Sequence, residues 1–373
     1  MEIKGIKYKS PSLDGSGYGQ ASRGYILALH RMGIPITLNS TLFEKDRPDL
    51  GADGKLLNSL EGKNIDYNIV ITQLTPNLLE RHIEQDKFNI CYCVWETNKL
   101  PLSWPSLIND YADAVMVGSQ FNVDVYKNSG VTKPIFCIPH GIDMSEFENA
   151  VPFNLRGVKP DTFKFYNISQ FTERKNPMAL IKAYWHAFSE GENVALVLKT
   201  YRADYSDREK EAVRATIKSL RHGMPIENRP PIYLISDQLS RSEILGLHKT
   251  CDCFISLDRG EGFGLGGLEA GASGNPIIVT KFGGVTEYAK PDNSYLVNYS
   301  LTPTFGMPWS NMWYSGDQMW AEPDCGMAVE YMRHVYDERS YENKRGQKLK
   351  QHIEDNLSWD KVANRMLEAI RSI

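Results

Sequence analysis

The chain has 373 residues and a mass of 42.3 kDa, more than an ordinary domain of about 100–200 residues, so two domains are expected. Its 42 Lys and Arg against 46 Asp and Glu give a net charge of −4, which argues against a protein that holds nucleic acid mainly through phosphates. The apolar runs are strand length, far below the about 20 residues of a membrane span. The N-terminus does not have the pattern of a signal peptide, so we expect a cytoplasmic protein without a transmembrane segment.

Short β-branched runs alternate with amphipathic stretches in the first half of the chain. We expect strands at residues 3–8, 34–38, 68–72, 88–94, 114–117 and 134–138, and helices after the Gly-rich stretch 14–19, at 77–85 and at 120–128. This alternation is typical of a parallel sheet covered by helices on both faces.

The alternation stops between residues 139 and 160, which we interpret as an interdomain linker. It resumes with strands at 163–168, 194–200, 232–236, 253–257 and 276–280, and with helices at 177–189, 206–221, 240–249 and 264–274. From Gly316 onward we expect mostly helix, including one that begins within 320–324 and a terminal one with Ser358 as its N-cap. The chain is therefore predicted to be α/β, with two doubly wound halves in tandem.

The six cysteines include two C-x-C pairs in strand-like segments, Cys91 with Cys93 and Cys251 with Cys253. Such a pair points both thiols to one face of a strand, where they hold a metal or fill a core. Zinc sites usually have other spacings or His partners, so we interpret the pairs as buried, reduced core residues.

The strongest local pattern is Arg259-Gly-Glu-Gly-Phe-Gly-Leu-Gly-Gly-Leu-Glu269, which follows a strand and opens a helix. Glycines let backbone N–H groups approach a charged ligand, and a helix N-terminus favours anions. The segment therefore predicts a diphosphate cradle. Glu261 and Glu269 would repel phosphate and suit hydroxyl groups, as on a sugar and a ribose.

The same segment contains G-x-G-x-x-G at residues 262–267, the dinucleotide fingerprint. Its context differs from that of a dinucleotide site, because it lies late in the second half and no acidic residue ends a strand about 20 residues later. A nicotinamide-dependent oxidoreductase is therefore disfavoured.

Glu261-x7-Glu269 is similar to the E-x7-E signature of the family 4 retaining glycosyltransferases, which have the GT-B fold. Four further segments resemble that family in the same order: Asp14–Gly19, Pro139–Asp143, Gly267–Thr280 and Gly283–Glu287. The resemblance implies two Rossmann-like domains that face each other across a cleft, with a C-terminal helix that crosses back to the first domain. We place the first, acceptor-side domain at 1–150, the second, donor-side domain at 151–355 and the terminal helix at 356–373.

The resemblance also implies roles for individual residues. Glu261 would contact hydroxyls of the donor sugar, and Glu269 would bind the ribose. The backbone amides of Phe263, Gly264 and Leu265 would meet the diphosphate. Gly17 would approach the β-phosphate from the first domain.

The family places an Arg and a Lys on the diphosphate, in the loop that here spans residues 169–177. Lys175 fits the lysine, but Gln170 stands at the usual arginine position, so Arg174 is the candidate for the second cation. Both cations would stabilise the leaving diphosphate. Lys199, at the end of the next strand, is a further candidate for donor binding.

Two other groups of residues are candidates for the acceptor side. Glu96, after the strand at 88–94, could orient an acceptor hydroxyl or cap a helix, whereas His140 fits a hinge better than a proton shuttle. The late aromatic residues suit sugar contact or core packing: Phe305, Trp309, Trp313, Tyr314 and Trp320.

We therefore expect a retaining glycosyltransferase that moves a sugar from a nucleoside diphosphate sugar, of UDP- or GDP-hexose type, to an unidentified hydroxyl. The acceptor could be a saccharide, a lipid-linked glycan or another hydroxyl. A sugar-nucleotide isomerase of the same architecture and a transferase that acts on a polymer, such as hydroxylated DNA bases, stay open. No D-x-D triplet occurs, so we expect neither a metal ion nor another cofactor.

Overall fold

The computed structural model describes residues 1–43, 48–225, 228–307 and 313–373, and for residues 340–343 it describes the backbone only. The chain divides into two compact units, residues 1–143 with 355–373 and residues 144–354. Each unit is built on a six-stranded parallel sheet. The predicted α/β class with two doubly wound sheets is confirmed.

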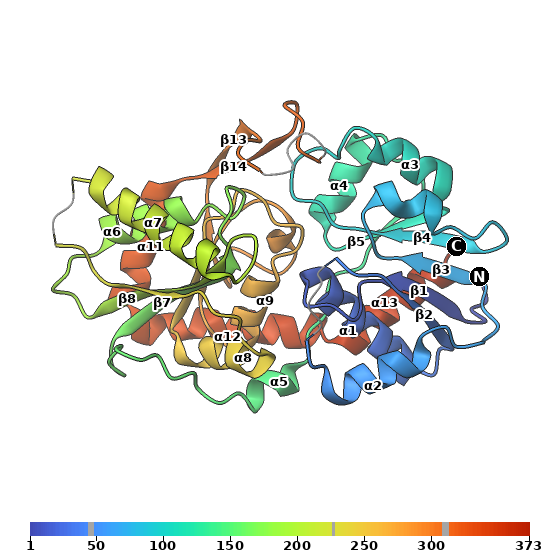
Figure 1. Cartoon of the computed structure of the whole chain (residues 1–373), viewed down its shortest axis with the longest axis horizontal. Helices are drawn as coiled ribbons and strands as arrows, with labels where there is room; N and C mark the ends of the chain where they lie inside the picture. The colour runs from blue at the N-terminus through green and yellow to red at the C-terminus, as the bar shows by residue number, and fades with distance from the viewer. Residues whose placement is uncertain (44–47, 226–227, 308–312) are drawn as a thin grey trace. The chain divides into compact units, whose positions relative to one another are not determined.

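The first unit has the strand order β2-β1-β3-β4-β5-β6. The strands are β1 (Ile6–Ser10), β2 (Ile36–Ser40), β3 (Ile69–Thr72), β4 (Phe88–Tyr92), β5 (Ala114–Val117) and β6 (Ile135–Cys137). The helices are α1 (Gly17–Arg31), α2 (Gly51–Leu60), η1 (Pro76–Arg81), α3 (Trp104–Tyr111), α4 (Gln120–Asn128) and α13 (Trp359–Arg371). Helices α1 and α13 lie on one face of the sheet and α3 and α4 on the other (Figure 1).

The terminal helix α13 belongs to the first unit because its Trp359 packs into α1. The indole occupies the space that a side chain at Gly24 would need, and it meets the ring of Tyr25 edge-on at 5.1 Å. Ser358 caps the helix by accepting a hydrogen bond from the Lys361 amide, as predicted. The C-terminal segment is thereby fixed to the N-terminal sheet.

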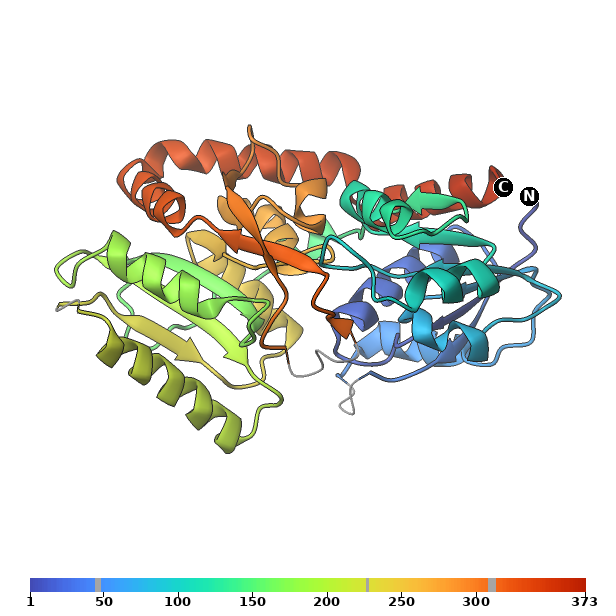
Figure 2. The same cartoon turned by 90° about the horizontal axis from the view of Figure 1, so that it is seen from above.

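The second unit has the strand order β12-β11-β10-β7-β8-β9. Its strands are β7 (Phe163–Gln170), β8 (Val194–Tyr201), β9 (Ile232–Ile235), β10 (Cys253–Ser256), β11 (Ile277–Thr280) and β12 (Tyr295–Val297). Its helices are α5 (Met144–Glu148), α6 (Pro177–Ala187), α7 (Asp207–Gly223), α8 (Arg241–Thr250), α9 (Leu265–Ala272), η2 (Gly284–Glu287), α11 (Cys325–Asp337) and α12 (Arg339–Asn356). An antiparallel pair, β13 (Tyr299–Pro303) and β14 (Met319–Pro323), stands apart from the sheet (Figures 1 and 2).

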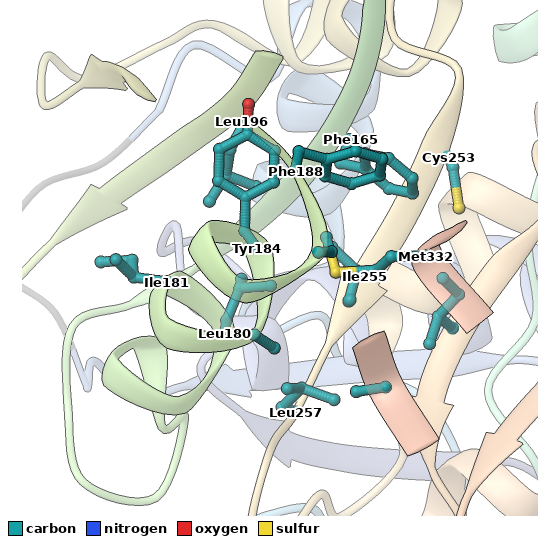
Figure 3. Packing of buried hydrophobic residues seen from close by; sticks show 14 of the residues in the cluster. Phe165, Leu180, Ile181, Tyr184, Phe188, Leu196, Cys253, Ile255, Leu257 and Met332 are labelled. Carbon is teal, nitrogen blue, oxygen red and sulfur yellow. The ribbon is translucent and has the colours of Figure 1, made fainter. Parts of the chain in front are cut away.

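The core of the second unit lies between the sheet and helices α6 and α11. Phe165 of β7 and Leu196 of β8 pack there against Tyr184 and Phe188, at the end of α6, and against Met332 of α11 (Figure 3). Such burial of large apolar side chains is the main force that holds the layers together. Because this core holds the sheet in place, the carboxyl ends of β7 and β10 give the loops that follow them fixed positions.

Two expected elements differ from the structure. The helix expected at 77–85 is the short 3-10 helix η1, which begins at Pro76 and ends at Arg81. The helix expected to begin within 320–324 is replaced by strand β14, whose Trp320 and Ala321 are fully buried, and Asp324 instead caps α11. Here tertiary burial overrides the local helical pattern.

No described helix has both the length and the apolar composition to cross a membrane. The cysteines of both C-x-C pairs are buried and unbridged. Within the described part of the chain, no group of three or more His, Cys, Asp or Glu side chains is arranged to hold a metal ion.

Candidate functional site

A cavity of about 40 Å³ lies in the second unit, where the carboxyl ends of β7 and β10 meet the start of α9. Backbone from Gly264 to Gly267 forms one wall, and the side chains of Lys175, Asp258 and Glu261 form another. In a parallel sheet this edge is the usual place for a ligand, and a helix N-terminus there offers unpaired N–H groups to an anion.

Two of the predicted catalytic residues, Lys175 and Glu261, line this cavity, and a third, Arg174, contacts Glu261. The Lys175 ammonium contacts the Glu261 carboxylate and lies 3.7 Å from Asp258 Oδ2. Arg174 Nη1 lies 3.5 Å from Glu261 Oε1 and donates a hydrogen bond to the Gly260 carbonyl at 2.8 Å. The four side chains are 10–19% exposed, so solvent screens the cluster weakly. Removing one partner would leave a buried charge uncompensated.

The glycine-rich turn keeps its shape through close backbone contacts. Gly264, at φ +86°, precedes α9 in a conformation that L side chains rarely adopt, and Tyr288 donates its hydroxyl hydrogen bond to the Gly264 carbonyl. Gly284 N donates to the Glu261 carbonyl at 2.7 Å, and a Cβ at Gly284 would overlap the backbone of Gly262 and Phe263. Burial raises the pKa of Tyr288 well above its usual value, so its hydroxyl stays a donor.

Glu269 lies on α9 and belongs to a buried network rather than to the cavity wall. Its carboxylate pairs with Arg241 Nη1 and approaches His248 Nε2 at 3.4 Å. The other ring nitrogen of His248 is 2.7 Å from the Tyr166 hydroxyl, and Arg241 also pairs with Glu146 at 2.7 Å. Burial acts to lower the pKa of Arg241, but the two carboxylates raise it on balance. The network fixes the Glu269 side chain through two direct contacts, with Arg241 and His248.

The two other predicted diphosphate contacts, Phe263 and Leu265, lie on either side of Gly264. The Phe263 side chain is 3% exposed and meets the Tyr288 ring at 5.6 Å, while Leu265 begins α9 and lines the cavity.

Gly17 and Glu96 lie in the first unit. Gly17 begins α1, after the N-cap Ser16, and Glu96 is half-buried in the loop after β4. Burial raises the pKa of the Tyr18 hydroxyl, and the charge of Glu96 adds a smaller effect in the same direction. Glu96 therefore lies near Tyr18, at the start of α1. His140 is buried against Tyr25 and Tyr92, and its burial lowers its pKa to about 3.

Arg259, to which the sequence analysis gave no role, connects the two loops of the candidate site. Its backbone N–H donates to the Arg174 carbonyl at 2.8 Å, and its side chain donates to the Glu173 carbonyl at 2.6 Å and to Glu322 of β14 at 2.7 Å. Arg259 therefore fixes the loop that carries Lys175 to the turn that carries Glu261. Its position next to the glycine-rich turn was the only available signal.

Arg259→Ala is expected to lower kcat/KM for donor turnover by about 10–100-fold, because displacement of a positioned cation costs about 1–3 kcal/mol. Arg259→Lys should recover part of the loss, since an ammonium keeps the charge but cannot form the planar set of bonds. Steady-state kinetics on both variants and on the exposed control Arg221→Ala would measure this. Equal activity of Arg259→Ala and wild type would exclude a positioning role.

Lys199 of β8 pairs in register with Ile168 of β7, which is one of the residues that line the cavity. Only 4% of Lys199 is exposed, and its ammonium lies 4.8 Å from the ring centroid of Tyr205 and 5.8 Å from that of Tyr201. It does not line the cavity among the described residues. Burial lowers its pKa to about 8.

Lys199→Met is expected to stabilise the protein at pH 7 by about 1–3 kcal/mol. The lowered pKa of Lys199 shows that burying its charged ammonium destabilises the folded state, and the variant removes this charge. Between the folded pKa of about 8 and the unfolded value of 10.5 the unfolded chain binds more protons, so wild-type stability rises with pH in that window. The variant should lose this rise. Urea unfolding at pH 7 and pH 9.5, with exposed Lys249→Met as control, would measure it, and a destabilised variant would contradict it.

A larger groove of about 680 Å³ lies elsewhere in the second unit, between Trp185 of α6, the α7 helix and β9. Its charged lining is mostly basic, with Arg214, Lys218 and Arg221 on α7. It lacks the glycine-rich turn and the close cation–carboxylate cluster, so the smaller cavity is the better candidate site.

Residues 154–300 match the family "Glycosyl transferases group 1". The chain is 23% identical over 283 residues to an uncharacterized protein of Sulfolobus islandicus rod-shaped virus 1, across 74% of each chain. It is 25% identical over 151 residues to a D-inositol 3-phosphate glycosyltransferase of Pseudarthrobacter chlorophenolicus, which covers 40% of this chain and 34% of that relative.

Two solved structures share the fold over the whole chain. HepE of Anabaena, in complex with UDP-glucose, matches with a TM-score of 0.68 at 14% identity and covers 100% of both chains. Sucrose-phosphate synthase of Thermosynechococcus elongatus matches with a TM-score of 0.68 at 13% identity and covers 99% of this chain and 98% of that one.

Proposed function

We propose that the chain is a glycosyltransferase that moves a hexose from UDP-hexose or GDP-hexose to an acceptor hydroxyl, with retention at the anomeric carbon and without a metal ion. The match of residues 154–300 to the group 1 family and the fold shared with HepE support this proposal. The observation that carries this proposal is the Lys175–Glu261 pair on the wall of the cavity where the glycine-rich turn begins α9.

The diphosphate of the donor would lie at the start of α9. There the backbone N–H groups of Phe263, Gly264 and Leu265 would meet the diphosphate, and the helix dipole favours negative charge. Lys175 and Arg174 would neutralise the charge that develops on the leaving diphosphate. The Lys175 ammonium contacts the Glu261 carboxylate in the structure. Donor binding would separate this pair, because Lys175 would then contact a phosphate oxygen and Glu261 would contact sugar hydroxyls.

Transfer would proceed by attack on the face from which the diphosphate leaves. The bond from the anomeric carbon to the diphosphate oxygen breaks, a bond to the acceptor oxygen forms on the same face, and the acceptor proton goes to the leaving diphosphate. Glu269, held by Arg241 and His248, is positioned to bind the ribose. Gly17, Glu96 and Lys199 remain our proposed residues for the β-phosphate, the acceptor and the donor.

Of the two proposed donors, UDP-hexose is supported by the fold shared with HepE, whose structure is a complex with UDP-glucose. The name of the Pseudarthrobacter chlorophenolicus relative, D-inositol 3-phosphate glycosyltransferase, supports a hydroxylated acceptor. We also place the protein in the cytoplasm, because its six cysteines are unbridged, as expected in a reducing compartment.

A screen of UDP-, GDP-, ADP- and dTDP-sugars tests this function, with thermal shift and nucleoside diphosphate release as readouts, in EDTA and in Mg²⁺. We expect one nucleotide sugar to stabilise the wild type and to be hydrolysed slowly in EDTA, and Glu261→Gln to lose turnover. Conversion of the nucleotide sugar to another sugar without nucleotide release would identify an isomerase instead. Dependence on Mg²⁺ would contradict the metal-free reaction.

A further inference from the structure

The larger groove of the second unit, about 680 Å³ in volume, is lined by apolar and basic side chains together. The apolar part comes from Trp185 of α6, from Ile217 of α7 and from Ile232 and Leu234 of β9. Small-molecule sites typically have about 300–1000 Å³ and are lined mainly by apolar side chains, with a few polar groups that fix the ligand. The groove therefore has the size and the composition of such a site.

The charges of the groove are one-sided. Its lining has three cations on α7, among them Arg214 and Lys218, and a fourth at Arg229, against the single carboxylate of Glu190. The Lys218 ammonium has no ion-pair partner within the described residues, and Arg214 pairs at 3.6 Å with a glutamate of its own helix, where both side chains are more than half exposed. Such an exposed pair is weak, and like charges four residues apart on a helix repel each other. An anion in the groove would relieve this repulsion.

Two hydrogen-bond donors of the lining residues are buried without an acceptor. Trp185 is 5% exposed, and within the described part of the chain neither its Nε1 nor the Nε of Arg229 has a hydrogen-bond partner. The Arg229 guanidinium lies over the Trp185 ring, 5.0 Å from the ring centroid, and donates through another nitrogen to the Met224 carbonyl. Because a buried donor without an acceptor destabilises the folded state, an occupant with acceptor oxygens is favoured here.

The apolar surface of the groove is left uncovered because the second half of α7 packs loosely. Among the residues of α7, all of which the structure describes, only Val213 is buried. Ile217, one turn later, is partly buried and lines the groove, in the same stretch of helix as Arg214 and Lys218. The rise from Arg214 to Lys218 is about 6 Å, at about 1.5 Å per residue. One small ligand can therefore contact both the cations and the apolar side chains.

We propose that the groove binds a small organic anion that joins a phosphate group to an apolar body. The phosphate would lie against Arg214 and Lys218, because phosphate oxygens accept strong hydrogen bonds from cationic donors. The body would cover Trp185 and Ile217 and remove their apolar surface from water. The groove shares no lining residue with the donor cavity, so this ligand is neither the sugar donor nor the leaving diphosphate. The site goes beyond the proposed function and does not depend on it.

Other occupants fit only part of the groove. Inorganic phosphate would leave the apolar lining in water, and a neutral apolar molecule would leave the cations uncompensated. A nucleic acid strand needs a row of cations along its phosphates, whereas residues 207–211, at the other end of α7, carry three acidic and two basic side chains. A phosphate ester with an apolar body satisfies both parts of the lining.

The test measures binding by isothermal titration to the full chain in low-salt buffer. The probe is 1-naphthyl phosphate, with 1-naphthol as the same body without the anion and inorganic phosphate as the anion without the body. The variants are Arg214→Glu and Lys218→Glu, and the matched control is Arg208→Glu, the same kind of charge reversal at an exposed position of α7 outside the groove. Lys175→Ala reports whether the probe enters the donor cavity instead. Melting temperatures close to the wild-type value show that the variants are folded.

We expect 1-naphthyl phosphate to bind the wild type at least about tenfold more tightly than inorganic phosphate or 1-naphthol does. Arg214→Glu and Lys218→Glu should each raise its Kd by at least about fivefold, because each reverses a charge beside the phosphate. Arg208→Glu and Lys175→Ala should keep the Kd within about twofold of wild type, because both changes lie outside the groove.

Three results would overturn the inference. The first is that 1-naphthyl phosphate does not bind, and the second is that inorganic phosphate or 1-naphthol binds equally well. The third is that Arg208→Glu or Lys175→Ala weakens binding as much as Lys218→Glu does, which would place the probe elsewhere. Failure of the nucleotide-sugar screen would contradict the proposed function and would leave this inference untouched, because the two sites are tested with different ligands.

Discussion

Lys175→Ala is expected to lower kcat for donor turnover by about 100–1000-fold, the largest effect on activity that we predict. The ammonium is the cation closest to Glu261 and Asp258, and the proposed reaction needs it to stabilise a leaving diphosphate in a weakly solvated cavity. Loss of one such electrostatic contact typically costs about 3–4 kcal/mol of transition-state stabilisation. Stopped assays of nucleoside diphosphate release with the identified donor would measure it.

The control for this prediction is Lys182→Ala, which removes an exposed lysine from α6 in the same unit. It should retain wild-type kcat. A circular dichroism spectrum and a melting temperature close to the wild-type values would show that Lys175→Ala is folded. If folded Lys175→Ala then keeps kcat within about threefold of wild type, Lys175 does not act on the leaving group.

Gly284→Ala is expected to have the largest effect on stability. The added Cβ would overlap the Gly262 carbonyl and the Phe263 backbone, so two backbone segments must separate. Overlap with backbone cannot be relieved by a side-chain rotation, and we expect a loss of about 2–4 kcal/mol and of about 5–15 °C in Tm. The same displacement would move the turn that carries Glu261 and should abolish donor binding.

Gly191→Ala provides the matched control, because a Cβ at Gly191 meets no atom within 4 Å. It should change Tm by only about 1–2 °C, in either direction, through the entropy of the unfolded chain. Differential scanning calorimetry of both variants measures the difference. A Gly284→Ala protein as stable as Gly191→Ala would mean that the two turns are not packed together as described.

The fold could be predicted because its signals are local. Short β-branched runs alternate with amphipathic helices, and this pattern alone predicts a parallel sheet with helices on both faces. The glycine-rich turn could also be predicted from the sequence, because Glu261, Gly264 and the start of α9 lie within a few residues of each other. The prediction that Lys175 and Glu261 belong to one site rested on the resemblance to a family, because no local pattern relates their two loops.

The parts that could not be predicted depend on partners far apart in the chain. Arg259 pairs with Glu322 at a separation of 63 residues, and Glu269 pairs with Arg241 at a separation of 28. No local pattern encodes such pairs. A helix was expected to begin within the segment that forms strand β14. The burial that makes this segment a strand comes from the rest of the unit and leaves no local signal in the sequence. Trp309, one of the aromatic candidates, lies outside the described residues.

The central claim is that the small cavity binds the nucleoside diphosphate of a sugar donor through Lys175 and the start of α9. Isothermal titration of UDP, GDP and NAD⁺ into wild type and Lys175→Ala tests it most directly, because binding needs neither the sugar nor the acceptor to be known. We predict that UDP or GDP binds the wild type at one site, that Lys175→Ala weakens this binding by at least about tenfold, and that NAD⁺ does not bind. Binding of NAD⁺ without either nucleoside diphosphate, or equal affinity of the two proteins for UDP and GDP, would contradict the account.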